Sequence, residues 1–265
     1  ALSYLQGRGL NAKIIRHFGL GCAPNRWDGL LRHMRQKGYS EAELVNANLA
    51  RRSDKNGRTS CYDNFRNRMM IPIIDLRGNV IAFGGRVLDD AKPKYVNTSD
   101  TLVYKKSQAI FALNFAKSAN QGKLILAEGY MDVIAYHQAG FTNAVACLGT
   151  ALTREQARLL ARYADEVILS YDADGAGQEA TRRAIGIFNE IGMKLRVLRL
   201  SGGKDPDEIL RQYGPDRLRD LLEGAANDVE YRLLREREKF DVSIPDGKVS
   251  FLTAAIGVLA QVDSP

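Results

Sequence analysis

Acidic residues follow three short apolar stretches in the second half of the sequence, at points where strands are expected to end. Glu128 follows the first stretch, Asp172 and Asp174 follow the third, and Asp205 and Asp207 come shortly after the fourth. Sites in open α/β sheets form outside the carboxyl ends of the strands, so we expect these carboxylates to converge. Such a cluster repels itself unless cations neutralise it, and hard oxygen ligands suit Mg²⁺ or Mn²⁺. The pattern therefore predicts a metal-dependent site.

The same acids admit other interpretations. Each acid could cap the helix that follows it, which explains any one of them but explains Asp172 and Asp174 together poorly. An EF-hand loop starting at Asp172 fails, because its twelfth position is Arg183, where a bidentate Glu is required. An aspartyl-phosphate phosphatase remains a rival, although it leaves Glu128 unexplained. No phosphate-binding loop of the Gly-x-x-x-x-Gly-Lys-Ser/Thr type occurs.

The elements that must position these acids alternate between strands and helices. Short apolar runs predict strands at 124–127, 144–147, 167–171 and 195–200, and amphipathic runs between them predict helices at 131–139, 153–163 and 178–191. Thr153 with Gln156 fits a capping box at the start of the second of these helices. This alternation implies a mainly parallel sheet with helices on its faces. Everything after Asp207 is predicted to be helical.

The first region has a different pattern. Asn11 is placed to cap a short helix, and Ser40 with Glu43 fits a capping box. Two apolar runs, 69–74 and 80–83, flank a turn and predict a β-hairpin. Pro72 within the first run argues for an edge position or a bulge.

Charge is divided unevenly along the chain. Residues 1–123 hold 21 basic and 9 acidic side chains, a net charge of +12, whereas residues 124–265 hold 17 basic and 22 acidic ones, a net charge of −5. A basic half beside an acidic half suits a polyanion held by one part while the other part holds metal ions. Two solvated surfaces with a chance imbalance are the alternative.

Basic residues of the first region flank the predicted strands. Arg66 and Arg68 alternate before the hairpin, so both are expected on one face, and Arg86 follows two glycines that allow close backbone approach. Such positions suit contacts with triphosphates or phosphodiesters. The lysines with the same predicted role are Lys94, Lys105 and Lys106.

Composition narrows the class of protein. The chain has 265 residues, of which 45% are hydrophobic, and no apolar run approaches the roughly 20 residues of a membrane helix. The cysteines, at positions 22, 61 and 147, form no zinc-binding pair. We expect a reduced, cytoplasmic protein without zinc. Since the sequence lacks an initiator Met, we also expect it to be a fragment of a longer chain.

Two segments resemble a TOPRIM domain: Glu128-Gly129-Tyr130-Met131-Asp132, and Asp172-x-Asp174 that follows it. The wider context resembles the catalytic core of bacterial DnaG-type DNA primases. The further matching segments, in the family's order, are Phe65-Arg66-Asn67-Arg68-Met69-Met70-Ile71-Pro72-Ile73, Gly84-Gly85-Arg86-Val87, Pro93-Lys94-Tyr95-Val96-Asn97, Leu148-Gly149-Thr150 and Lys204-Asp205-Pro206-Asp207.

The resemblance implies an α/β fold in three parts. These are a basic N-terminal α+β subdomain at 1–122, a TOPRIM domain with a parallel sheet at 123–204, and a helical C-terminal subdomain at 205–265. We expect the family's zinc-binding and helicase-binding domains to be absent from this sequence.

The resemblance also implies template-directed synthesis of short RNA primers on single-stranded DNA from ribonucleoside triphosphates, through two Mg²⁺ or Mn²⁺ ions, with an RNA–DNA hybrid as product. Glu128, Asp172 and Asp174 would be catalytic and hold the metals. Asp205, Asp132 and Asp207 would assist as metal ligands. Nucleotide or DNA would be bound by Arg66, Arg68, Arg86, Lys94, Lys105 and Lys106.

Partners and location follow from the same resemblance. The replicative helicase would be a partner of the full-length protein, which would work at the bacterial replication fork in the cytoplasm, with no membrane contact. Two rivals remain open: a TOPRIM nuclease, which would cut DNA, and a non-catalytic single-stranded DNA-binding module, whose binding would not depend on Asp172 or Asp174.

Overall fold

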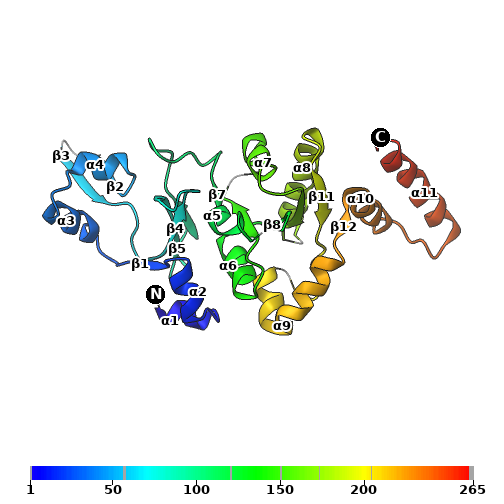
Figure 1. Ribbon diagram of the computed structural model, residues 1–265, viewed down its shortest axis with the longest axis horizontal. Coiled ribbons are helices and arrows are strands. Elements are labelled where there is room, and N and C mark those ends of the chain that lie inside the picture. Colours follow the sequence, from blue (N-terminus) through cyan, green and yellow to red (C-terminus); the bar gives the residue numbers. More distant parts are fainter. Residues whose placement is uncertain are drawn as a thin grey trace.

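The computed structural model describes residues 2–55, 58–119, 121–149, 151–172, 174–203 and 205–262. Thr150, Ala173 and Lys204, which belong to the segments that carry the resemblance, lie outside the described residues. Three regions follow one another along the molecule, from the N-terminal elements through a central sheet to the C-terminal helices (Figure 1).

The N-terminal region is built on an antiparallel sheet with the order β1-β4-β5-β6. Its strands are β1 (Gly21–Ala23), β4 (Arg68–Ile74), β5 (Val80–Val87) and β6 (Tyr95–Asn97). The predicted hairpin is confirmed, because β4 pairs antiparallel with β5. Pro72 lies beyond the last residue that pairs with β1, so only β5 flanks the strand there. The ladder shifts register between Ile73 and Ile74.

Short helices also belong to this region: α1 (Leu2–Gly7), α2 (Ala12–His17), α3 (Gly29–Gln36) and α4 (Glu41–Asn46). Both predicted caps are confirmed. The Asn11 side chain accepts a hydrogen bond from the Ile14 N–H at 2.9 Å, and Ser40 forms a reciprocal capping box with Glu43. A second hairpin, β2 (Ala50–Lys55) with β3 (Arg58–Asp63), occupies a stretch whose polarity gave no strand signal.

The central sheet has the order β12-β11-β10-β8-β9-β7. The predicted parallel core consists of β8 (Lys123–Ala127), β9 (Ala144–Cys147), β10 (Glu166–Ser170) and β11 (Lys194–Val197). Two antiparallel edge strands were not predicted. They are β7 (Ile110–Phe111) and β12 (Ala226–Asn227), which come from segments on either side of 123–204.

Helices pack against this sheet because its strands are apolar on both faces. They are α5 (Leu113–Ala116), α6 (Tyr130–Gln138), α7 (Arg154–Leu160) and α8 (Gly175–Glu190). A capping box between Thr153 and Gln156 opens α7, as predicted. One apolar cluster includes Leu124, Leu126 and Phe188, all essentially inaccessible, whereas Ile125 and Ile168 belong to the cluster shared with α6 and the N-terminal sheet.

The chain then continues mainly as helices α9 (Pro206–Glu223), α10 (Asp228–Arg237) and α11 (Pro245–Leu259). Gly214 breaks the helical geometry of α9 with φ +78°, directly before Pro215. α10 lies beside the central sheet, whereas α11 lies at the opposite end of the molecule from the N-terminal region (Figure 1). In the part of the chain that the structure describes, no helix is both long and apolar enough to cross a bilayer.

Candidate metal and nucleic-acid site

The acidic edge of the central sheet is formed where β8 and β10 end side by side. These neighbours pair in parallel, with Ala127 opposite Ser170, so the residues that follow them emerge together. Glu128 and Asp172 are in direct contact: the Asp172 N–H donates a hydrogen bond to Glu128 Oε2 at 3.1 Å. The predicted convergence of these two acids is therefore present in the structure.

Asp132 lies in the first turn of α6, close to the same edge. Its Oδ2 accepts a hydrogen bond from the Gly129 N–H at 3.0 Å. Burial raises the pKa of the Asp132 carboxyl to about 8, with further contributions from the charges of Asp172, Asp205 and Glu128. Four carboxyl groups from three strand ends thus share one electrostatic environment. An all-oxygen donor set with an excess of negative charge fits a hard divalent cation.

The stricter expectation, that Glu128, Asp172 and Asp174 lie within reach of one ion, is not met by the side chains as they stand. Among the described residues, no three His, Cys, Asp or Glu side chains are grouped closely enough to hold a metal. Asp174 instead caps α8, its Oδ1 accepting from the Gly177 N–H at 2.8 Å. A partial protein shell still suits Mg²⁺, which commonly keeps several waters and takes substrate phosphate oxygens as ligands.

Gly177 explains how the turn after β10 is shaped. A Cβ atom at this position would lie 2.1 Å from the backbone oxygen of Asp172, closer than any real contact. Only glycine therefore allows the first turn of α8 to pack on the backbone of Asp172.

Asp205 and Asp207 have different surroundings. Asp205 caps α9, with its Oδ1 accepting from the Glu208 N–H at 2.7 Å. Asp207 is 3% exposed, and its Oδ2 forms ion pairs with Arg8 at 2.6 Å and Arg211 at 3.2 Å. Because two arginines already compensate this carboxylate, we remove Asp207 from the predicted metal ligands and assign it to the joint between α9 and the N-terminal region.

Arg86 of β5 is 9% exposed and lies against the rings of Tyr95 and Tyr4. Its Nη1 donates to the hydroxyl of Tyr95 at 2.9 Å, and its guanidinium carbon lies 5.7 Å from the centroid of the Tyr4 ring. Burial raises the pKa of Tyr95, which the Arg86 charge opposes and the Asp132 charge reinforces. The pKa of Tyr95 thus responds to charges in both the basic and the acidic regions. Tyr95 was not predicted as a site residue.

Arg68 is internal instead of facing a ligand. It is 8% exposed, and its guanidinium donates to the carbonyls of Gly85 at 3.1 Å, Pro93 at 3.1 Å and Lys94 at 3.5 Å. These bonds tie β5 to the segment before β6. Burial lowers the pKa of Arg68, and the charge of Arg66 adds to this effect. We therefore remove Arg68 from the predicted nucleotide-binding set.

Arg66 lies on an aromatic surface. Its guanidinium carbon is 4.3 Å from the centroid of the Trp27 ring and 5.2 Å from that of Tyr62. Trp27 itself is 66% exposed, so it is not a core residue. A cation stacked on exposed aromatic rings is a surface that phosphates and bases can both contact. A tryptophan far from Arg66 in sequence gave no signal of this pairing.

The three predicted lysines are accessible to different degrees. Lys94 and Lys105 are exposed and Lys106 is partly buried. The Lys106 Nζ lies 3.7 Å from the place where a Cβ on Gly149 would stand, and Asn97 Nδ2 lies 3.1 Å from it. Asn97 Oδ1 accepts from the Tyr130 hydroxyl at 2.9 Å. The loop after β9 is thus bordered by a lysine and an amide, of which only the lysine was predicted.

The N-terminal sheet and helix α6 approach each other closely at Gly84. A Cβ at this position would lie 2.7 Å from the Tyr130 hydroxyl, and Tyr130 belongs to α6, next to Asp132. The predicted close approach at this glycine is therefore made by a residue of the acidic motif.

Comparisons with known proteins agree with this geometry. The family model described as DNA primase catalytic core, N-terminal domain, matches residues 1–117, and the model described as Toprim-like matches residues 125–210. A solved structure of the DnaG primase catalytic domain bound to ssDNA is 36% identical, with a TM-score of 0.82 over 99% of this chain and 83% of that chain. The chain belongs to the DnaG primase catalytic core family.

Curated relatives are longer. A DNA primase from Clostridium acetobutylicum is 44% identical over 264 residues, which are 99% of this chain and 44% of the relative. A DNA primase from Deinococcus radiodurans is 46% identical over 268 residues, covering 99% of this chain and 46% of the relative. This DnaG-family chain therefore spans less than half the length of these two relatives.

Proposed function

We propose that this chain is the RNA-synthesising part of a DNA primase, which joins ribonucleoside triphosphates into short RNA on a single-stranded DNA template. The observation that carries the proposal is the direct contact between Glu128 and Asp172 at the ends of β8 and β10, with Asp132 in the adjoining first turn of α6, in a chain of the DnaG core family. The TOPRIM primases are metal-dependent, and we propose Mg²⁺ or Mn²⁺ as the metal.

Each group has a role in the proposed reaction. Glu128, Asp172 and Asp174 would hold the metal ions, with Asp205 and Asp132 assisting. Bound there, the ions would supply charge neutralisation for the attacking 3′-oxygen and the departing pyrophosphate. Arg86, with Lys94, Lys105 and Lys106, would bind the triphosphate. Positioning and charge neutralisation supply most of the rate in phosphoryl transfer.

The template would run over the basic N-terminal region. Arg66 stacked on Trp27 offers a charged and aromatic contact suited to single-stranded nucleic acid. A relative of the same fold is bound to ssDNA, which supports this use of the region. In the longer protein, we propose the RNA–DNA hybrid as product and the replicative helicase as partner at the replication fork.

The test is incorporation of labelled ribonucleotides on a single-stranded template with Mg²⁺ or Mn²⁺. Wild type is compared with Asp172→Asn and with Asp246→Asn, a matched change at an exposed position of α11. We expect short RNA from wild type and Asp246→Asn only. Cutting of the template without RNA synthesis would favour the nuclease. DNA binding by all three proteins without any chemistry would favour the binding module.

A further inference from the structure

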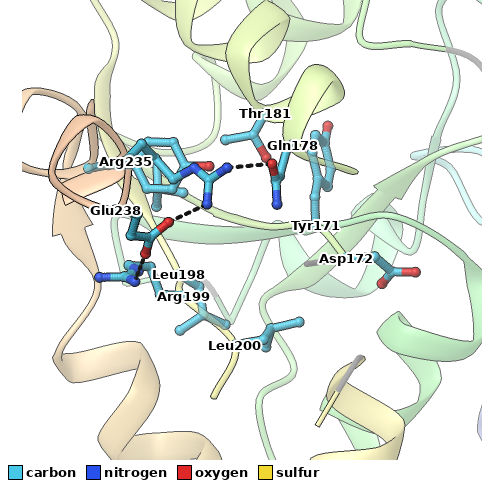
Figure 2. A pocket seen from close by; sticks show the side chains of 11 residues that line it. Tyr171, Asp172, Gln178, Thr181, Leu198, Arg199, Leu200, Arg235 and Glu238 are labelled. Atoms are coloured by element: carbon cyan, nitrogen blue, oxygen red, sulfur yellow. Dashed lines mark hydrogen bonds and ion pairs between the residues drawn. The ribbon is translucent and has the colours of Figure 1, made fainter. Parts of the chain in front are cut away.

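A pocket of about 220 Å³ lies beside Asp172, on the side away from the N-terminal region. It is lined by residues at the ends of β10 and β11 and on helices α8 and α10 (Figure 2). Tyr171 and Asp172 line it at the end of β10, and Gln178 lines it from the first turn of α8. Of the C-terminal helices, α10 therefore lines the pocket next to Asp172.

A chain of polar contacts crosses this pocket from Arg199 through Glu238 and Arg235 to Gln178 (Figure 2). Arg235 Nη2 donates to Gln178 Oε1 at 2.5 Å, and Arg235 Nη1 donates to Glu238 Oε2 at 2.5 Å. The second oxygen of Glu238 accepts from Arg199, which follows β11. Glu238 thus orients the planar guanidinium of Arg235. The other terminal nitrogen of this guanidinium contacts Gln178 of α8.

The first turn of α8 is in turn fixed to the two acids before it. The Gln178 N–H donates to the backbone oxygen of Asp174 at 2.9 Å, and the Gly177 N–H donates to its Oδ1 at 2.8 Å. Gly177 also packs directly on the backbone oxygen of Asp172. Any restraint on Gln178 is therefore a restraint on both acids.

We propose that Arg235 is a positioning residue for the acidic site: through Gln178 it holds the first turn of α8, and with it the backbone of Asp172 and Asp174, at the acidic edge of the sheet. The inference rests on the proposed function, because it takes these acids as metal ligands. Helix α10 is not part of the central sheet, yet under this proposal its Arg235 contributes to the site. Residues that orient metal ligands from outside typically change metal affinity by 10- to 100-fold when removed.

The experiment measures Mn²⁺ binding directly by isothermal titration calorimetry, beside thermal unfolding of each variant. Arg235→Ala and Gln178→Ala should each weaken Mn²⁺ binding by about tenfold. Both should remain folded, because Tyr231 of α10 still packs against the apolar cluster that contains Phe188 of α8. Arg237→Ala is the matched control, since this arginine lies on the same helix and is exposed; it should bind Mn²⁺ like wild type.

Two further variants separate positioning from general stability. Gln178→Glu keeps an acceptor for Arg235. Its Mn²⁺ affinity should therefore stay within about twofold of wild type, because an ion pair replaces the amide contact. The double variant Arg235→Ala with Gln178→Ala should bind no more weakly than either single variant, since both act through one contact.

Contrary outcomes are clear. Wild-type Mn²⁺ affinity in Arg235→Ala, equal losses in Arg237→Ala, or additive losses in the double variant would each overturn the proposal. Its failure is distinguishable from failure of the proposed function. A wild type that binds Mn²⁺ in an Arg235-dependent way but makes no RNA would refute primer synthesis while supporting the positioning role.

Discussion

The backbone oxygen of Asp172 lies 2.1 Å from the point where a Cβ on Gly177 would stand, so the two residues can pack only because position 177 is glycine. This contact joins the end of β10 to the start of α8. It fixes the direction in which Asp172 leaves the sheet, and the site depends on that direction.

We predict that Gly177→Ala lowers RNA synthesis by about a hundredfold, the loss that a shift of about 1 Å in a catalytic group can produce. The added methyl must displace either the backbone of Asp172 or the first turn of α8. Gly175→Ala is the control, because a Cβ there meets nothing within 4 Å, and alanine favours the helix. Steady-state incorporation of labelled nucleotide measures both. Equal activity of the two variants would contradict the prediction.

Arg66 provides a test of the template surface. We predict that Arg66→Ala weakens binding of single-stranded DNA and lowers the slope of log affinity against log salt concentration by about 0.7, the value for one phosphate contact with a single strand. Arg237→Ala, at the exposed end of α10, should leave the slope unchanged. Fluorescence anisotropy at several salt concentrations measures it. A slope in Arg66→Ala that matches wild type would exclude a phosphate contact at this residue.

Local signals in the sequence predicted much of the fold. The caps at Asn11, Ser40 and Thr153 were identified because each depends on residues within one turn. The strands of the parallel core were identified because they are buried and apolar, although helix and strand ends differ from the predicted ones by up to a few residues. The edge strands β7 and β12 were missed, because two residues are too few to show a period.

The positions of site residues were predicted correctly where the order of the strands determines them. They were not predicted where a contact with a residue distant in sequence determines them. Glu128 meets Asp172 because parallel strands end together. Arg68 and Arg66 gave the same sequence signal, but their contacts differ. Arg68 donates a hydrogen bond to the carbonyl of Pro93, whereas the guanidinium of Arg66 lies over the ring of Trp27. The partner of Asp207 is Arg8, 199 positions away, and no pattern in a single sequence indicates such a pairing.

Asp207 therefore offers a direct test of that reassignment. We predict that Asp207→Asn destabilises the protein by about 3 kcal/mol, because it removes one member of a nearly buried ion pair and leaves the Arg8 charge uncompensated. Its Mn²⁺ affinity should stay within about twofold of wild type, since the carboxylate is bound to arginines. Urea unfolding and calorimetry measure the two quantities. A large loss of Mn²⁺ affinity with unchanged stability would return Asp207 to the metal ligands.

His137 makes the folded state sensitive to acid. It is 5% exposed, and its Nε2–H donates to the backbone oxygen of Ala144 at 3.0 Å. Among the described residues its buried Nδ1 has no hydrogen-bond partner. Burial and the charge of the nearby His17 together lower the pKa of His137 from 6.5 to about 4, although the hydrogen bond with Ala144 acts in the opposite direction.

The sign of the effect follows from proton uptake. Between pH 6.5 and about 4 the unfolded chain holds a proton on His137 that the folded chain does not, so the free energy of unfolding falls as the pH falls through this window. This destabilisation reaches about 3 kcal/mol at pH 4 and is absent above pH 6.5. In His137→Gln, whose amide can still donate to Ala144, the free energy of unfolding should fall less steeply over this window. Urea unfolding from pH 7 to pH 4 measures both slopes, and the carboxylates common to both proteins cancel in the difference. Parallel pH profiles would show that His137 titrates alike in the folded and unfolded chains.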